Sequence, residues 1–320
     1  MRRLSSLVLA LIVAGAGVVV GNGSIAAQPG AQGRPIRVVT GLGIVQDLVQ
    51  RVGGDRVEAF SLVPPCADPH TYQPTPRDIQ ALQGARLAVW NGLGLDETAA
   101  DLVAEQGLPD LTTVVLSDGI TPLMGDSHDD EAEAHEEGEA EHEGEEHGHA
   151  AGNPHLWLDP AYAVRYVQTI RDTLAEVDPA NAETYRANAT TYIGEINALD
   201  AWAKGEIATI PADRRKLVTF HDAFPYFADH YGLDLVGVVV KSPGREPSAQ
   251  EVAALVTEIR QHQIPTVYAE PQFNARILEL AARDAGVQVK RLYSDAFDDQ
   301  VKTYLDLMRF NVNSVVEGLR

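Results

Sequence analysis

The hydrophobic positions of this chain form short β-branched runs that alternate with segments of helical period. In the first part of the chain, four runs are typical of strands: 36–40, 57–63, 86–90 and 113–116. A helix is expected at 44–52, and another begins at Thr75, a capping residue followed by proline and then by an acid in the first turn. This alternation predicts an α/β unit with a mostly parallel sheet.

The same alternation returns after two long helical segments, 161–176 and 181–210. Strands are expected at 216–220, 235–240, 266–269 and 287–293, and helices at 224–231, 248–262, 274–285 and 300–319. The fold class is therefore α/β: two (βα)-type lobes with mostly parallel sheets, joined by one long backbone helix. The expected domains are an N-terminal lobe at 34–178, a linking helix at 179–210 and a C-terminal lobe at 211–320.

One segment, 121–152, breaks this pattern. Between 126 and 149 it holds twelve acids, five histidines and no lysine or arginine, a composition that cannot bury a core. We expect a mobile loop whose histidines recruit metal ions weakly: His128, His135, His142, His147 and His149. The alternative is a solvated spacer.

The start of the chain has the features of a signal peptide. Two arginines precede a 14-residue apolar run at 7–20, and small residues follow at 24–27. The run is shorter than the ~20 residues that a membrane-spanning helix needs. We expect a signal peptide at 1–27 and a periplasmic or otherwise extracytoplasmic protein, with no cysteine after the run to carry a lipid.

Composition narrows the class of protein. The 320 residues are 45% hydrophobic and 22% charged, which excludes a disordered chain and a multi-pass membrane protein. A net charge of −21 argues against nucleic acid as a partner and favours cations. The one cysteine, Cys66, rules out an intramolecular disulfide and a four-cysteine zinc site. We interpret it as a small loop residue.

Three histidines stand where an α/β protein collects its ligands. His70 and His221 follow predicted strands, and His155 precedes a predicted helix. His230 and His262 fall in or at the end of helices, so we interpret them as surface or packing residues.

Two acids, Glu270 and Asp295, also follow strands. Three neutral imidazoles and one carboxylate complete a four-coordinate shell that suits zinc. The candidates are far apart in the chain, so a structural histidine stays an alternative for each one taken singly.

Several phrases carry a resemblance to a known family. In order they are 68–76 (DPHTYQPTP), 154–160 (PHLWLDP) and 219–227 (TFHDAFPYF), extended by 246–249, 269–272 and 293–295. Over about 35–320 the chain resembles the zinc-binding, periplasmic solute-binding subunits of bacterial ABC importers for zinc and manganese.

The resemblance implies two lobes that hold one metal ion in the cleft between them. Its ligand positions fall on His70, His155, His221 and Asp295, while Glu270 would orient a histidine. Manganese-type members usually carry glutamate where this chain has His221, and zinc-type members carry a His- and acid-rich insertion. Both features resemble the zinc branch.

The chain departs from the family pattern at two places. Ala296-Phe297 follow Asp295 where Pro-Leu is common, so Glu270 or a water stays an alternative fourth ligand. Cys66 stands where a glycine is expected.

The resemblance implies a monomeric receptor that captures Zn²⁺ as cargo and delivers it to an ABC-type membrane permease with a cytoplasmic ATPase. It would not be an enzyme. The alternatives are a manganese or iron receptor of the same family, a zinc hydrolase with Glu270 as general base, and a metal-binding adhesin. The hydrolase lacks support because no His-Glu-x-x-His motif is present.

Overall fold

The computed structural model describes residues 34–124, 152–240, 244 and 247–320. The expected signal peptide at 1–27 and the five histidines of the acidic segment (His128, His135, His142, His147 and His149) lie outside the described residues. Residues Pro35–Arg320 form one compact unit.

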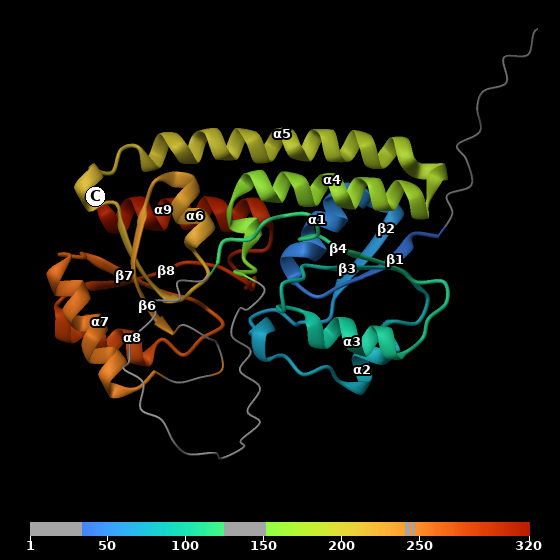
Figure 1. Cartoon of the computed structure of the whole chain (residues 1–320). Helices are drawn as coiled ribbons and strands as arrows, with labels where there is room; N and C mark the ends of the chain where they lie inside the picture. Colours follow the sequence, from blue (N-terminus) through green and yellow to red (C-terminus); the bar gives the residue numbers. More distant parts are fainter. Residues whose placement is uncertain (1–33, 125–151, 241–243, 245–246) are drawn as a thin grey trace, which may run out of the picture. The chain divides into compact units, whose positions relative to one another are not determined.

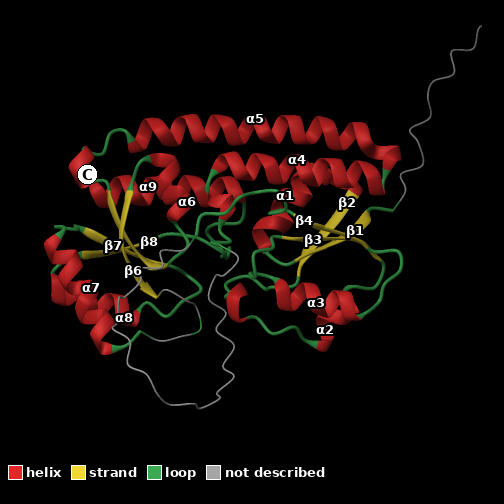
Figure 2. Ribbon diagram, viewed as in Figure 1, coloured by secondary structure: helices red, strands yellow, loops and turns green. Residues whose placement is uncertain are grey.

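The first sheet has four parallel strands in the order β2-β1-β3-β4. They are β1 (Ile36–Thr40), β2 (Val57–Ser61), β3 (Ala85–Trp90) and β4 (Thr112–Val115). The central strands β1 and β3 are mostly apolar and are buried along most of their length, because parallel sheets are covered on both faces. Figures 1 and 2 show helices on both sides of this sheet.

The second sheet repeats this design in the order β6-β5-β7-β8, again parallel. Its strands are β5 (Lys216–His221), β6 (Asp234–Val240), β7 (Thr266–Ala269) and β8 (Gln288–Arg291). In both sheets the first strand in sequence lies inside, the second flanks it, and the third and fourth continue on the other side. The predicted α/β fold with parallel sheets is confirmed.

The helices connect and cover the strands. They are α1 (Gly43–Gly53), α2 (Pro76–Ala81), α3 (Glu97–Glu105), α4 (Pro160–Val177), α5 (Ala182–Ile207), α6 (Pro225–Tyr231), α7 (Ala249–Gln261), α8 (Arg276–Ala285) and α9 (Tyr304–Leu319). Helix α5, with 26 residues, runs alongside α4 (Figure 1) and also packs on α1 and α9. One hydrophobic core contains residues of all four helices, so it joins the two halves of the chain.

Helix ends follow the capping signals in the sequence. Thr75 with Asp78 and Ser248 with Glu251 both form capping boxes. Gly286 ends α8 in the left-handed conformation, with φ of 78°.

Several elements differ from the prediction: β2 ends at Ser61 rather than 63, and α5 ends at Ile207 rather than 210. The sequence does not predict helix α3, because a helix of nine residues gives only a short periodic signal and glycines lie on both sides of it. Strand β8 ends at Arg291 rather than 293, and α9 begins at Tyr304 rather than 300. The later start has a local cause: the Thr303 side chain accepts a hydrogen bond from the Asp306 backbone and caps the helix there.

Among the described residues, no helix combines the length and the apolar character needed to cross a membrane.

Candidate metal centre

His70 follows β2 in a short 3-10 turn, Pro69–Thr71. The carboxylate of Asp68 fixes this turn: it accepts hydrogen bonds from the His70 backbone N–H at 3.0 Å and from the Thr71 hydroxyl at 3.1 Å. The turn holds the His70 side chain, which is 9% exposed, beside the other candidate ligands.

His155 precedes the 3-10 turn Leu156–Leu158 and is fully buried. Asn153 Oδ1 accepts from the His155 backbone N–H at 3.1 Å and lies 2.9 Å from ring Nδ1. The Asn153 amide nitrogen donates to the Asp222 carbonyl at 2.7 Å, which assigns Oδ1 as the acceptor toward His155. His155 therefore carries its proton on Nδ1 and directs the lone pair of Nε2 at the site.

His221 is the last residue of β5, and Glu270 follows β7 on the neighbouring strand. Glu270 Oε1 lies 2.8 Å from His221 Nδ1 and accepts from the His221 backbone N–H at 3.2 Å. Glu270 thus contacts the ring nitrogen that is turned away from the other histidines. It is placed to orient His221 and to leave Nε2 for a ligand.

Asp295 lies four residues beyond the end of β8 and is 3% exposed. Its Oδ1 is 3.2 Å from His155 Nε2, and its Oδ2 is 3.3 Å from His221 Nε2 and 3.8 Å from His70 Nε2.

The four side chains converge on one point. His155 Nε2 lies 3.3 Å from His70 Nε2 and 3.2 Å from His221 Nε2. One ligand atom of each of the three histidines and Asp295 lies within 4.8 Å of the others. An ion about 2.0–2.1 Å from each ligand in a tetrahedral shell separates the ligands by about 3.3–3.4 Å, which is close to these spacings.

Buried charge gives the centre its preference for a cation. Burial acts to raise the pKa of Asp295, but His155 and His221 outweigh it and hold that pKa well below the usual range. Burial acts to lower the pKa of His221, but Glu270 and Asp295 raise it well above the usual range. When the imidazoles are neutral, as metal binding requires, Asp295 leaves a buried negative charge at this point that a divalent ion would balance.

One buried oxygen supports this interpretation: among the described residues Asp295 Oδ1 has no hydrogen-bond donor apart from His155 Nε2, 3.2 Å away, and that nitrogen carries no proton when the proton is on Nδ1. A buried acceptor without a donor is costly. A metal ion facing the three Nε2 atoms would satisfy it, so the residues present fit a bound divalent ion.

Two supporting residues, Ser294 and Gln272, lie in sequence segments that carry the family resemblance, but the sequence alone predicts no role for them. Ser294 Oγ donates to Glu270 Oε2 and lies 3.1 Å from Asp295 Oδ2. Gln272 Nε2 contacts Ser294 Oγ at 2.8 Å and Asp295 Oδ2 at 3.2 Å. Both belong to the loops after β7 and β8, where strand ends collect polar residues.

The two halves of the chain are also linked around the site. Trp157, beside His155, donates its indole N–H to the Ser294 carbonyl at 2.9 Å. The Tyr226 hydroxyl of α6 donates to the Asn153 carbonyl at 2.8 Å and accepts from the Leu123 backbone at 2.9 Å.

Cys66 lies outside the metal cluster, in agreement with its interpretation as a loop residue. Its φ of 62° is in the left-handed region, which explains why glycine is the expected residue at this position. Its backbone N–H donates to the Phe297 carbonyl at 3.1 Å.

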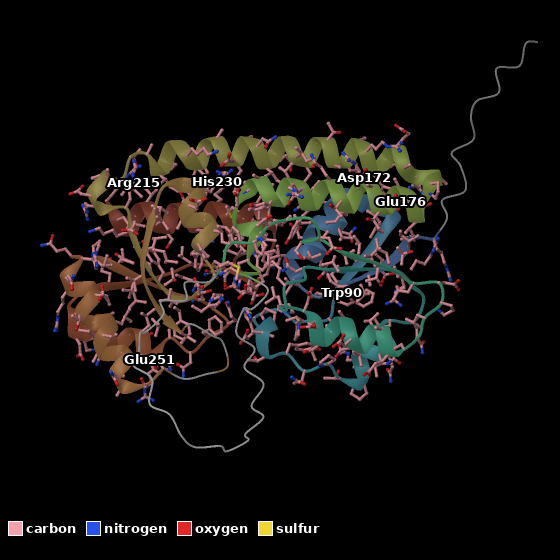
Figure 3. The ribbon with its side chains drawn as sticks, in the orientation of Figure 1. Trp90, Asp172, Glu176, Arg215, His230 and Glu251 are labelled. Atoms are coloured by element: carbon pink, nitrogen blue, oxygen red, sulfur yellow. The ribbon has the colours of Figure 1, made fainter. Side chains whose placement is uncertain are left out.

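His230, labelled on α6 in Figure 3, lies between two carboxylates. Its Nδ1 is 2.8 Å from Asp159 at the start of α4, and its Nε2 is 2.8 Å from Asp200 on α5. The hydrogen bond to Asp159, together with that to Asp200, raises the pKa of His230 against the effect of burial. It is thus an ion-paired packing residue that joins α6 to two other helices. His262 pairs with Glu258 one turn earlier in α7, at 3.2 Å.

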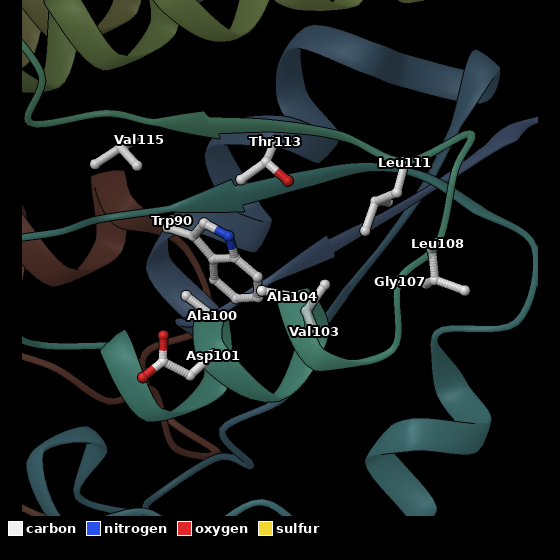
Figure 4. Close-up of a pocket in the computed structure, with 10 residues that line it drawn as sticks. All are labelled: Trp90, Ala100, Asp101, Val103, Ala104, Gly107, Leu108, Leu111, Thr113 and Val115. Atoms are coloured by element: carbon white, nitrogen blue, oxygen red, sulfur yellow. The ribbon is translucent and has the colours of Figure 1, made fainter.

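A pocket of about 370 Å³ lies elsewhere, between α3 and the edge of the first sheet (Figure 4). Apolar side chains such as Trp90, Leu108 and Leu111 line it, and Asp101 is its one charged residue. It holds none of the candidate ligands and lacks the donors that a metal ion needs.

Two parallel sheets whose loops and strand ends bring three imidazoles and a carboxylate together at one point define a binding protein for a divalent metal ion. The chain belongs to the family described as zinc-uptake complex component A, periplasmic (ZnuA), whose family model matches residues 38–318. It is accordingly a substrate-binding receptor of a metal ABC transporter.

Relatives of the chain are named for different metals. The manganese-binding lipoprotein MntA of Halalkalibacterium halodurans is 31% identical over 317 residues, 98% of this chain and 96% of that protein. The iron-binding protein YfeA of Yersinia pestis is 33% identical over 294 residues, 91% of this chain and 88% of that protein. The high-affinity zinc uptake system protein ZnuA of Bacillus subtilis is 29% identical over 304 residues, 93% and 92% of the two chains.

The solved structures that the chain resembles also include metal-binding proteins. A crystal structure of ZnuA matches with a TM-score of 0.75 at 27% identity, covering 89% of this chain and 100% of that chain. A manganese-bound periplasmic metal binding protein from Candidatus Liberibacter asiaticus matches with a TM-score of 0.74 at 26% identity and the same coverage. The family therefore establishes a metal receptor without fixing which metal it carries.

Proposed function

We propose that this chain captures Zn²⁺ outside the cytoplasmic membrane and delivers it to an ABC permease driven by a cytoplasmic ATPase. The ligands are His70, His155, His221 and Asp295, and the ion is cargo rather than a catalytic cofactor. The observation that carries the proposal is the convergence of three imidazole Nε2 atoms, with neighbouring distances of 3.2–3.3 Å, on one buried carboxylate.

The donor set favours zinc over manganese. Imidazole nitrogen suits zinc, whereas manganese prefers shells rich in carboxylate, carbonyl and water oxygen. A set of three nitrogens and one carboxylate therefore favours zinc. His221 is the deciding ligand, because a glutamate at this position would make the set two nitrogens and two carboxylates. The names of the relatives support a metal receptor but leave manganese and iron as alternatives.

Capture and docking are coupled in this proposal. His70 and His155 precede the long helix α5 and His221 and Asp295 follow it, so one ion joins residues of an N-terminal lobe (34–178) and a C-terminal lobe (211–320). A permease would distinguish the loaded receptor by that joined arrangement. A shell filled by four protein ligands leaves no open position for a reactive water, which separates this site from a zinc hydrolase.

The direct test is a thermal melt of metal-stripped protein lacking the signal peptide and residues 126–149, with excess zinc or excess manganese. A ligand at ~1,000 times its Kd stabilises a protein by about 4 kcal/mol, a rise of several degrees in Tm for a chain of this size. We expect a large shift with zinc and a small one with manganese.

A larger shift with manganese would instead assign the chain to the manganese receptors. No shift with either ion would reject the site, and turnover assays with ester, peptide and phosphate substrates would then test the hydrolase. Zinc uptake that persists in cells lacking the protein would favour an adhesin or a passive buffer.

A further inference from the structure

We propose that Gln272 is a positioning residue that keeps one oxygen of Asp295 away from the metal ion, so that Asp295 binds through its other oxygen alone. The site is thereby held at four ligands and selects zinc against manganese. This inference rests on the proposed function, because it explains the selectivity of that same site.

The two oxygens of Asp295 have different surroundings. Oδ2 lies 3.2 Å from Gln272 Nε2 and 3.1 Å from Ser294 Oγ, whereas Oδ1 is buried without a hydrogen-bond partner among the described residues. Both are near the ion's position, since Oδ1 is 3.2 Å from His155 Nε2, and Oδ2 is 3.3 Å from His221 Nε2 and 3.8 Å from His70 Nε2. Without a competing donor, both oxygens would be free to bind the ion.

Counting hydrogens identifies Gln272 as that donor. Ser294 has one hydroxyl hydrogen, and its shortest contact is with Glu270 Oε2. Gln272 has two amide hydrogens; one is directed at Ser294 Oγ, 2.8 Å away, and the other at Asp295 Oδ2. Every hydrogen of the chain Glu270–Ser294–Gln272–Asp295 then has one acceptor.

The orientation of the Gln272 amide follows from the same contacts. Glu270 Oε2, at 3.4 Å from Nε2, and Asp295 Oδ2 can only accept when ionised. A flipped amide would direct its carbonyl oxygen at two carboxylates, so nitrogen must face them. The carbonyl oxygen Oε1 remains buried without a partner among the residues described, a cost that the hydrogen bonds of the nitrogen offset.

Freeing Oδ2 would change the coordination of the ion. An Asp295 bound through both oxygens raises the ligand number from four to five and adds a hard oxygen donor. Both changes favour manganese relative to zinc, because zinc tolerates tetrahedral shells and manganese favours oxygen-rich ones of higher coordination.

The experiment compares the full chain with Gln272→Met, Ser294→Ala and a control, Gln106→Met. Gln106 donates to the Leu102 carbonyl on α3, and neither residue belongs to the metal cluster. Each protein receives one equivalent of Co²⁺ for visible absorption spectroscopy, and Kd values for zinc and manganese are measured by competition. Four-coordinate cobalt absorbs strongly in the visible range, and cobalt of higher coordination absorbs weakly.

We expect strong absorption from the unmodified chain and from Gln106→Met. Gln272→Met should absorb weakly, and its ratio of manganese Kd to zinc Kd should fall about tenfold, within the range known for groups that orient metal ligands. Ser294→Ala should move both readouts the same way by a smaller amount, because Glu270 then competes for the Gln272 amide.

The outcomes separate the two proposals. Weak absorption from the unmodified chain overturns the four-coordinate zinc site itself. Strong absorption from all four proteins with an unchanged Kd ratio overturns the role of Gln272 and leaves the zinc site standing. An equal rise in the Kd values for zinc and manganese, with unchanged absorption, also overturns the role of Gln272, since a merely structural contact would give that result. If Gln272→Met fails to fold, Ser294→Ala decides by the same criteria.

Discussion

The two pairs of candidate ligands are held in different ways. The N-terminal pair, His70 and His155, sits on turns, and a neutral amide, Asn153, supports His155. The C-terminal pair, His221 and Asp295, is joined by a hydrogen-bonded chain that contains the second carboxylate, Glu270. Both sheets have the same strand order, so the difference comes from the loops and not from the topology.

Binding one divalent ion requires both negative charge and enough ligands, and the two pairs contribute these separately. The C-terminal pair supplies the negative charge that balances a divalent ion, and it is assembled within its own half of the chain. The N-terminal pair supplies two neutral nitrogens and completes the shell. The Asn153 amide links them, because it holds His155 with its oxygen and the Asp222 carbonyl with its nitrogen.

Removing one ligand from each pair tests the contrast most strongly. Asp295→Asn should weaken zinc binding by more than the about 10- to 100-fold that loss of an orienting group costs. His70→Asn should cost less, because it removes a ligand without removing charge. Isothermal titration against a competing chelator measures both, and equal losses would contradict the division of tasks.

Replacing the residues that orient the histidines, Glu270 and Asn153, should have smaller effects on zinc affinity, and only one of the two replacements should change the pH dependence of binding. Glu270→Gln should lower zinc affinity about 10- to 100-fold. It should also move the pH midpoint of binding to lower pH, because the raised pKa of His221 falls when its carboxylate partner is gone and protons then compete less.

Asn153→Leu is the matched variant, since it removes a neutral acceptor from His155. Its loss of affinity should be smaller and its pH midpoint unchanged. The same shift of the midpoint in both variants would show that charge does not distinguish the two pairs.

The His230 ion pairs provide a test of stability away from the metal. The folded-state pKa of His230 is raised, so its contribution is fully present below its ordinary pKa of about 6.5 and is lost as pH rises through the folded value. His230→Asn should destabilise the metal-free protein by about 2 kcal/mol at pH 5.5, and by less at pH 9. Urea unfolding at the two pH values measures this, and a difference that grows with pH would refute it.

The smallest effect is expected from deleting 126–149. The four proposed ligands lie outside that segment, so zinc affinity at the tight site should stay unchanged while weaker binding disappears. Equilibrium dialysis over a wide range of zinc concentration counts both classes of site. Loss of the tight site would contradict the ligand assignment.

Strand and helix positions were predictable wherever local chemistry determines them. Capping residues such as Thr75 and Ser248 begin helices as expected, and the alternation of elements predicts the parallel sheets. Helix α3 was missed because a short helix gives little periodic signal.

The convergence of the candidate ligands was predictable only in part. Strand ends indicated His70, His221, Glu270 and Asp295, and a predicted helix start indicated His155, but only the resemblance to a family chose Asp295 over Glu270 as the fourth ligand. The roles of Gln272, Ser294 and Asn153 depend on contacts between residues distant in sequence or on side-chain orientation, which no local pattern encodes. Only the structure shows that Glu270 contacts His221 Nδ1, the ring nitrogen that is turned away from the other histidines.

The most direct test of the zinc site is X-ray absorption at the zinc edge of the full chain loaded with one equivalent of zinc. We expect four nitrogen or oxygen ligands at about 2.0–2.2 Å, three of them with the outer-shell scattering of imidazole. A sulfur ligand at about 2.3 Å, five or six ligands, or fewer than three imidazoles would contradict it.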